Sequence, residues 1–399
     1  MAVVMLAVFT VSVGYGVVLP LLPSLIARLL GEGTEIARVS RHTGLLTGVY
    51  TFALFLFAAV WGRLSDRHGR RNILIVGLLG LAVNMLAFSF VESFAALYVE
   101  RFLSGMFASA VTPVAAAAVG DFAATDHQRA RRLAFVSMAG GAGFLLGPML
   151  GVSISRFGTA FLARSEPAGS VAMPFAATAV LAFLVGLAVA FAIPGGHGSD
   201  RARPASIAPV AGNAWIVPKM LALTFIVSVG IGVFEVGLAL GGRQDLGLTP
   251  YRIALMFSEC TLVMFVVQAI VFSPWVQPDA TRWVIAPALG VLAAALFLVP
   301  RASDFALMLV AVGAVAASAG ILSPVLTYWI SKKAGSAQGW ELGRQTAAAS
   351  LGVSIGSAGG GFLFNATALP GAPFVLATGV VALGLVLSLG LPGPLARHQ

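Results

Sequence analysis

This chain consists of runs of about 20 apolar residues that are separated by short polar segments. A helix that crosses a lipid bilayer needs about 20 mainly apolar residues. The runs predict helices over residues 2–27, 44–61, 72–91, 95–119, 133–155, 171–193, 217–240, 251–273, 283–300, 305–330, 343–366 and 372–391. The pattern therefore predicts an all-α membrane protein with twelve transmembrane helices.

The longest break in this pattern covers residues 194–216 and is rich in glycine, proline and charge. Such a composition is typical of a flexible linker. It predicts an N-terminal six-helix bundle at 1–193, a cytoplasmic linker at 194–216 and a C-terminal six-helix bundle at 217–399. The segment Val11–Val17 recurs as Val227–Val233 with an offset of 216 residues. This match indicates a duplication, so we expect the two bundles to be pseudo-symmetric.

The composition agrees with a lipid environment and excludes several other classes of protein. Hydrophobic residues make up 59% of the chain and charged residues 10%, against about 45–50% and about 25% in soluble proteins. The net charge of +9 is explained by arginines beside membrane spans, so we predict contact with the lipid bilayer and none with nucleic acid. Cys260 is the only cysteine, and all five histidines fall in loops or the tail. The sequence therefore predicts no disulfide and no metal site.

The distribution of basic residues predicts the orientation in the membrane. With both termini inside, the inner loops hold 15 of the 24 lysines and arginines, including Lys219, Lys332 and Lys333. The positive-inside rule then places both termini in the cytoplasm of a multi-pass protein of the plasma (bacterial inner) membrane. The apolar run that begins at Met1 is interpreted as the first span, since it lacks the charged start and the cleavage site of a signal peptide.

The ten residues Gly62-Arg-Leu-Ser-Asp-Arg-His-Gly-Arg-Arg71 lie between two of the predicted spans. Their position predicts a tight cytoplasmic turn. They match the pattern G-x-L-(S/A)-D-(R/K)-x-G-(R/K)-(R/K) of the major facilitator superfamily, so the chain resembles a secondary transporter of that fold. Within the superfamily it is similar to the twelve-helix drug–proton antiporters of the tetracycline-efflux type. The resemblance implies a conformational latch formed by Gly62, Asp66, Arg67, Gly69, Arg70 and Arg71. The alternative is a basic loop that only sets the topology.

A second resemblance is carried by Arg101-Phe-Leu-Ser-Gly105, which fits the superfamily pattern R-x-x-x-G. A charged group inside lipid costs several kcal/mol, so Arg101 must face the bundle interior and find a partner. The resemblance implies a role in proton relay or substrate contact. The alternative is that Arg101 extends to the lipid headgroups, with Glu100 as its neighbour.

A third resemblance lies at Gly143, Gly147, Pro148 and Gly151, which fit the G-x-x-x-G-P-x-x-G signature of the antiporters. Glycines four residues apart let helices approach closely, and proline removes a hydrogen bond and kinks the helix. Packing glycines are common in membrane helices, but the proline at this position indicates an antiporter-type kink. The resemblance therefore favours export.

Two acidic residues, Glu235 and Glu259, fall within predicted spans of the C-terminal half. A carboxyl group in a low-dielectric environment binds protons more readily than in water, and it can also neutralise a cationic substrate. Both are predicted to serve proton coupling or substrate binding, although Glu235 also fits an interfacial position. Cavity candidates with polar edges, each of which could instead form a helix–helix hydrogen bond, are Tyr15, Tyr50, Asn84, Gln268, Tyr328 and Gln345.

The first span departs from the tetracycline-efflux pattern that it otherwise resembles. Its end has the form G-x-x-x-P-x-x-P, with Gly16, Pro20 and Pro23. The efflux proteins carry an acidic residue in this helix, whereas Val11 stands at the aligned place here and the span contains no acid. Any proton coupling must therefore use Glu235, Glu259 or the region of Arg101.

These features predict a secondary active transporter that exports small amphipathic molecules by proton-coupled alternating access. The chain has no G-x-x-x-x-G-K-(S/T) segment for nucleotide binding and no catalytic grouping. We therefore expect no enzyme activity and no cofactor, a proton gradient as the energy source, a small-molecule substrate and a monomer. One alternative is a symporter or facilitator for an organic solute, in which Arg101 binds an anionic group. The other is a non-transporting membrane sensor of the same fold.

Overall fold

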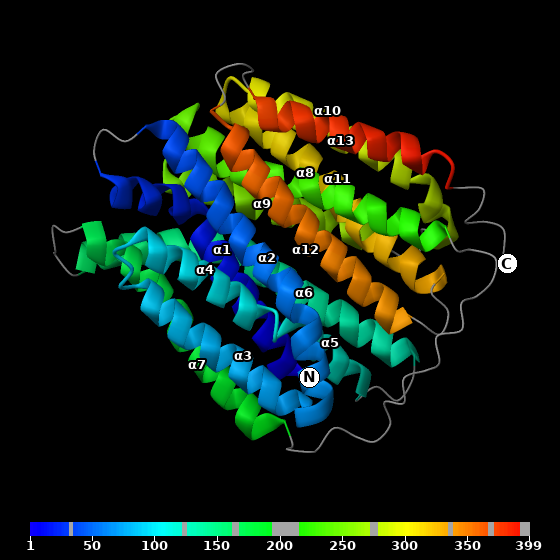
Figure 1. The fold of residues 1–399 in the computed structure, drawn as a ribbon, viewed down its shortest axis with the longest axis horizontal. Coiled ribbons are helices and arrows are strands. Elements are labelled where there is room, and N and C mark those ends of the chain that lie inside the picture. The colour runs from blue at the N-terminus through cyan, green and yellow to red at the C-terminus, as the bar shows by residue number, and fades with distance from the viewer. Residues whose placement is uncertain are drawn as a thin grey trace. The chain divides into compact units, whose positions relative to one another are not determined.

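A computed structural model of the protein describes residues 1–31, 35–121, 126–161, 167–193, 215–271, 278–333, 338–365 and 371–391. Apart from its last two residues, the predicted linker lies outside this part of the chain. The described residues form helices joined by short turns, with no strand among them (Figure 1). The helices are α1 (Ala2–Leu30), α2 (Ile36–His68), α3 (Arg70–Phe88), α4 (Phe94–Ala108), α5 (Thr112–Asp121), α6 (Asp126–Phe161), α7 (Pro167–Ala192), α8 (Ile216–Gln244), α9 (Pro250–Val271), η1 (Pro278–Trp283), α10 (Ile285–Leu298), η2 (Val299–Arg301), α11 (Phe305–Lys333), α12 (Gln338–Leu363) and α13 (Ala372–Ser388).

The predicted all-α membrane protein is confirmed. Among the described residues, 10 helical segments are long and apolar enough to cross a membrane, and α13 is a shorter apolar helix. The predicted span at 343–366 corresponds to α12, which is not among the ten. Its sequence is rich in glycine, serine and other small or polar residues, so its mean hydropathy is lower than that of the ten segments.

One predicted span is interrupted. The run 95–119 forms two helices, α4 and α5, separated at Ser109–Val111. The hydroxyl of Ser109 donates to the carbonyl oxygen of Met106 at 2.7 Å. The apolar pattern continues through this turn, so hydropathy predicts the length of the crossing but not its break.

The chain forms two compact units. Unit 1 consists of Met1–Thr34, Val49–Ala202 and Leu248–Ser258, and unit 2 of Glu35–Gly48, Arg203–Gly247 and Glu259–Gln399. Helices α2 and α9 therefore each contribute residues to both units. The division into 1–193 and 217–399 stays a prediction.

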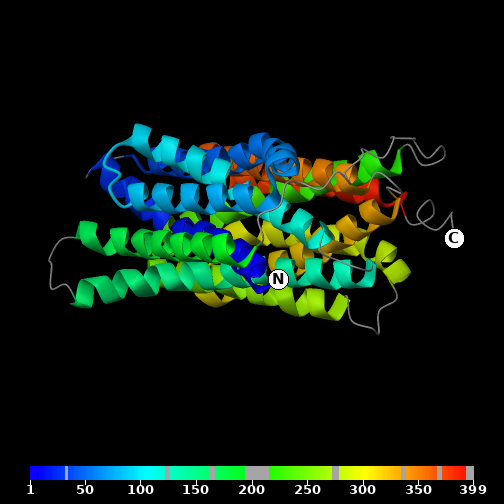
Figure 2. The same ribbon diagram turned by 90° about the horizontal axis from the view of Figure 1, so that it is seen from below.

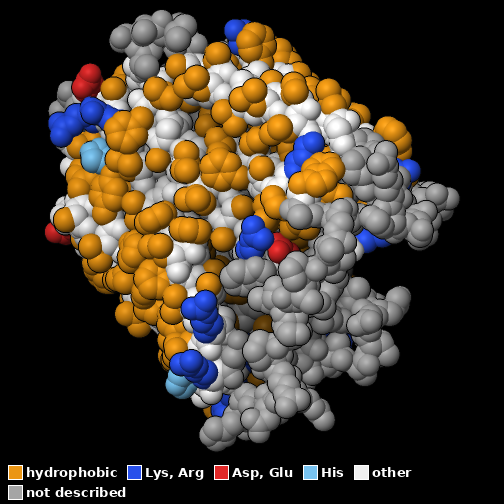
Figure 3. Space-filling view, turned by 45° about the vertical axis from the view of Figure 1, so that its right-hand side comes forward, with side chains coloured by type: hydrophobic (Ala, Val, Ile, Leu, Met, Phe, Trp, Pro, Cys, Tyr) orange, Lys and Arg blue, Asp and Glu red, His pale blue; other side chains and the backbone are white. Residues whose placement is uncertain are grey.

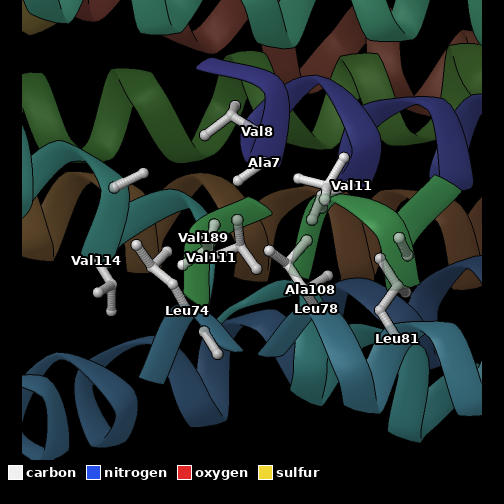
Figure 4. Close-up of a cluster of buried hydrophobic side chains, with 14 of the residues drawn as sticks. Ala7, Val8, Val11, Leu74, Leu78, Leu81, Ala108, Val111, Val114 and Val189 are labelled. Atoms are coloured by element: carbon white, nitrogen blue, oxygen red, sulfur yellow. The ribbon is translucent and has the colours of Figure 1, made fainter. Parts of the chain in front are cut away.

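The core of unit 1 is built from small branched side chains. Helix α1 packs against α6, α3 against α7, and α6 against α7, and the last pair lies side by side in Figure 2. Figure 4 shows Val11 of α1, Leu78 of α3 and Val111 among the buried side chains that gather between these helices. The packing of these helices also fixes the positions of the polar side chains of unit 1 around Arg101.

In unit 2, α8 packs against α12 and α13, and α10 packs against α11 and α13. Large side chains such as Trp329 and Met220 are fully buried there. The indole nitrogen of Trp329 donates to the hydroxyl of Thr281 at 3.0 Å, which fixes η1 against α11.

Large apolar side chains also cover much of the described exterior. Val83, Phe191 and Val310 are 70%, 88% and 70% exposed, and the face in Figure 3 is largely hydrophobic over its described part. Soluble monomers rarely expose continuous apolar patches of more than a few hundred Å². These side chains are suited to contact with lipid chains.

Candidate functional site

The predicted arginine in α4, Arg101, is buried inside unit 1 and paired with its neighbour in sequence. Arg101 is 2% exposed and Glu100 is 4% exposed. The guanidinium donates from Nε to Oε2 of Glu100 at 2.7 Å and from Nη2 to Oε1 at 3.0 Å. The expectation that Arg101 needs a partner is fulfilled, and the alternative of extension to the lipid headgroups is not what the structure shows.

Two uncharged side chains complete the hydrogen bonds of this ion pair. The amide nitrogen of Asn84 in α3 donates to Oε1 of Glu100 at 3.0 Å and to the hydroxyl oxygen of Ser104 at 2.7 Å. Ser104 in turn donates to the same Oε1 at 2.6 Å. A buried charge is tolerated when it is paired and hydrogen-bonded. Asn84, predicted either to line a cavity or to join helices, therefore joins α3 to α4.

Aromatic rings lie beside the guanidinium of Arg101. The ring centroids of Tyr50 and Phe88 are 5.5 Å and 5.1 Å from its central carbon. Tyr50 of α2 stacks on Tyr15 of α1 at 4.8 Å, and Tyr15 stacks on Phe144 of α6 at 5.8 Å. Cations and planar groups both interact favourably with such ring faces. The structure thus brings together the predicted residues Tyr15, Tyr50 and Arg101.

The two predicted acids of the C-terminal half both act on the same buried thiol in unit 2. Both Glu235 of α8 and Glu259 of α9 are within electrostatic reach of the Cys260 thiol. Oε2 of Glu259 is buried without a hydrogen-bond partner among the described residues. Its other oxygen, Oε1, lies 3.4 Å from where a Cβ on Gly313 of α11 would stand. Because an unpartnered buried carboxylate is costly, Glu259 is suited to hold a proton or a cation.

The remaining three cavity candidates have different surroundings in the structure. Gln345 in α12 is buried and donates to the hydroxyl of Thr327 in α11 at 2.8 Å, so it joins two helices. Tyr328 packs edge-on against Trp329, with the ammonium of Lys332 5.8 Å from the Tyr328 ring centroid. Gln268 is partly buried in α9.

The predicted turn at 62–71 is much shorter than expected. Helix α2 continues to His68 and α3 begins at Arg70, so only Gly69 lies outside a helix. Gly69 has a φ of 86°, which a residue with a side chain adopts only at a cost. The prediction of a ten-residue turn is wrong in extent, because one glycine suffices to reverse the chain.

The latch candidates are held by hydrogen bonds within unit 1. Arg70 donates to the hydroxyl of Ser65 at 2.6 Å, and Ser65 donates to the carbonyl oxygen of Gly62 at 2.7 Å. Arg71 donates to the carbonyl oxygen of Ala190 at the end of α7, while Arg67 is exposed. The side chain of Asp66 lies outside the described residues. The loop thus joins α2, α3 and α7, and its role as a latch stays a prediction.

The glycines of the antiporter-type signature face α1. A Cβ on Gly147 would lie 2.9 Å from the carbonyl oxygen of Val13, and one on Gly151 would lie 3.1 Å from a methyl carbon of Val17. Gly16 of α1 lies against the Phe144 carbonyl oxygen and the Pro148 ring. Proline at 148 cannot donate to the carbonyl four residues earlier, that of Phe144. The weakened part of α6 therefore rests directly on a glycine of α1.

A second glycine row, not singled out from the sequence, packs α12 against α8 in unit 2. A Cβ on Gly352 would lie 2.6 Å from the carbonyl oxygen of Phe225, and one on Gly356 would lie closer still to the carbonyl oxygen of Val229. Val13 and Val229 differ by 216 residues, the offset of the sequence repeat, and Gly147 and Gly356 differ by 209. The same offsets relate Gly16 to Gly232 and Pro148 to Ser357. The pseudo-symmetry thus extends to single contacts, with serine in unit 2 where unit 1 has proline.

Comparison with known proteins decides the family. The model of the Major Facilitator Superfamily matches residues 4–340. The chain belongs to the major facilitator superfamily. It is therefore a membrane transporter by family, and the superfamily resemblance of the motifs is confirmed.

Curated relatives and solved structures agree with this assignment. Multidrug resistance protein 2 of Bacillus subtilis (strain 168) is 26% identical over 397 residues, which cover 96% of this chain and 92% of the relative. Quinolone resistance protein NorA of Staphylococcus aureus (strain COL) is 25% identical, with 96% and 94% covered. The crystal structure of a D-xylose–proton symporter has a TM-score of 0.77 at 15% identity, with 98% of this chain and 96% of that chain covered. That of the human organic anion transporter MFSD10 (TETRAN) has a TM-score of 0.70 at 20% identity, with 97% and 98% covered. These structures share the superfamily fold.

Some contacts in both units had no signal in the sequence. In unit 2, Asn365 donates to the hydroxyl oxygen of Ser40 at 2.6 Å, and Gln244 donates to the same oxygen at 3.1 Å. Ser104 lies at a variable position of the R-x-x-x-G motif, where the pattern specifies no residue type. Its role depends on which helix face meets Asn84, and only the packing of α3 on α4 determines that.

Proposed function

We propose that the protein is a proton-coupled antiporter that exports small amphipathic molecules across the plasma membrane by alternating access. The observation that carries this proposal is the packing of α6 on α1 through Gly143, Gly147, Pro148 and Gly151, the signature that the antiporters of the superfamily share. The names of the resistance proteins that resemble this chain over nearly its full length support the same direction.

The substrate region in this proposal includes the rings of Tyr15, Tyr50 and Phe144. Stacked aromatic faces bind planar and cationic groups of many shapes with little dependence on hydrogen-bond geometry. A small number of polar groups then set the orientation of the ligand. Broad recognition of amphipathic molecules follows from such a lining.

Energy coupling in this proposal uses buried carboxyl groups. One oxygen of Glu259 is buried without a hydrogen-bond partner in the part of the chain that the structure describes, and both Glu259 and Glu235 act electrostatically on the Cys260 thiol. A carboxylate that neutralises a substrate cation in one state and binds a proton in another links the two flows, because both compete for one negative charge. The proton enters from the outside and leaves on the cytoplasmic side.

Inside-out membrane vesicles test the proposal. With an acidic lumen, vesicles that contain the protein should accumulate the lipophilic cation ethidium, and an uncoupler should release it. Vesicles without the protein are the control. Accumulation that persists unchanged after the uncoupler would reject proton coupling, and efflux from the lumen driven by the same gradient would reject the direction.

A further inference from the structure

Glu100 is the only carboxyl group within the predicted spans of residues 1–193, and none of the steps above gives it a role. It is 4% exposed and lies on α4. Its partner Arg101 cannot lose its proton under ordinary conditions. Within this ion pair, a proton can therefore be accepted only by the carboxylate of Glu100.

The two oxygens of Glu100 differ in their surroundings. Oε1 accepts hydrogen bonds from Asn84, Ser104 and Nη2 of Arg101, at 3.0, 2.6 and 3.0 Å. Oε2 accepts only from Nε of Arg101, at 2.7 Å, among the bonds of the described residues. Three donors fill the acceptor capacity of Oε1, so Oε2 is the oxygen with room for a proton.

We propose that Glu100 is the proton-binding group of unit 1 and that Asn84 and Ser104 are its positioning residues. The inference rests on the proposed antiport function and adds a site in the half of the chain whose first span lacks an acid. A proton delivered by the outer water forms an O–H bond at the lone pair of Oε2 that Nε of Arg101 leaves open, so that the bond from Nε now meets a neutral carboxyl group. The carboxyl group becomes neutral, and the guanidinium keeps its positive charge.

The consequence for the substrate follows from the rings beside Arg101. Among the described residues, the other titratable groups that act on Arg101 are Tyr50 of α2 and Tyr15 of α1, and a tyrosine hydroxyl is ordinarily neutral near pH 7. Protonation of Glu100 therefore leaves an uncompensated positive charge 5.5 Å from the Tyr50 ring centroid. That charge disfavours a cation on the Tyr15–Tyr50 stack. Loss of the proton restores the neutral pair and the affinity for the cation.

The test compares Glu100→Gln with Glu92→Gln, which removes an exposed carboxyl from the same short segment. Ethidium binding to the purified proteins is measured between pH 5.5 and 8.5. If one proton competes with one cation, the apparent dissociation constant changes by up to about tenfold per pH unit. Because Glu259 is also proposed to bind a proton in competition with the cation, we expect one common slope in the unaltered protein and in Glu92→Gln, and a clearly reduced slope in Glu100→Gln. An unaltered slope in Glu100→Gln overturns the inference.

If Glu100→Gln binds no ethidium at any pH, a second variant tests whether Glu100 binds the proton. Ser104→Ala keeps the carboxyl group but removes one donor to Oε1, so the midpoint of the pH profile should move. An unmoved midpoint would count against Glu100. Failure of the proposed antiport function is seen separately, as the absence of gradient-driven accumulation in vesicles of the unaltered protein.

Discussion

Ser354 in α12 donates its hydroxyl to the carbonyl oxygen of Gly48 in α2, at a distance of 2.9 Å. One to two turns along the same contact, Gly361 of α12 faces Gly44 of α2, so that the two backbones touch within unit 2. Small residues let membrane helices approach this closely, and a serine hydroxyl then reaches a backbone carbonyl. The contact depends on the absence of side chains at both glycines.

Replacing Gly361 with alanine should therefore destabilise the protein. The new Cβ would lie 2.5 Å from the carbonyl oxygen of Ser40 and 2.6 Å from the Cα of Gly44, and backbone atoms cannot move aside easily. Overpacking of this kind costs about 1–3 kcal/mol. Gly359→Ala is the matched control, because no atom lies within 4 Å of its Cβ position. We expect a lower Tm in detergent for Gly361→Ala alone, and equal values for the two variants would disprove the contact.

The repeated glycine rows give a second prediction, that Gly147→Ala and Gly356→Ala impair transport in the same way. The methyl group added at Gly147 would lie closer than 3.0 Å to the carbonyl oxygen of Val13, and the one added at Gly356 closer than 3.0 Å to that of Val229. These two valines are equivalent in the repeat, because they lie 216 residues apart. Both variants should slow gradient-driven ethidium uptake in vesicles and lower the Tm, whereas Gly359→Ala should do neither. Normal uptake by Gly356→Ala would show that only the row in α6 takes part in the transport cycle.

The two rows also show what the sequence could and could not predict. Apolar runs predicted the helices because a span is fixed by length and hydropathy, and a proline made Gly147 recognisable. Gly356 had no such marker in a chain with 46 glycines, and only the position of Val229 distinguishes it. Likewise, the sequence predicted that Arg101 needs a partner. The choice of Glu100 with Asn84 depends on the side-chain directions of two packed helices, which spacing alone does not determine.

The single-residue turn at Gly69 gives a third prediction. Its φ of 86° and ψ of 145° lie in a region that residues with a Cβ rarely adopt, at a cost of about 1–3 kcal/mol. Gly69→Ala should lower the Tm by a few degrees, and it should shift the Arg70–Ser65 hydrogen bond that follows the turn. Gly62→Ala provides the comparison, since Gly62 lies inside α2 and its Cβ would meet no atom within 4 Å. A Tm for Gly69→Ala at or above that of Gly62→Ala would contradict the turn geometry.

The last prediction concerns Glu259, whose Oε2 is buried without a partner among the described residues. Leaving such a group unsatisfied costs about 1–3 kcal/mol, so a residue kept for function rather than stability is expected here. Glu259→Gln removes the charge at nearly constant volume. We expect gradient-driven ethidium accumulation to be lost while the Tm is unchanged or higher, a separation that a structural role would not produce. Asp304→Asn is the control: Asp304 caps the start of α11 through the backbone nitrogen of Leu307 at 2.7 Å, and asparagine caps equally well. Full accumulation by Glu259→Gln would assign the coupled proton of unit 2 to Glu235 instead, and a clear fall in its Tm would show that Glu259 has a structural role.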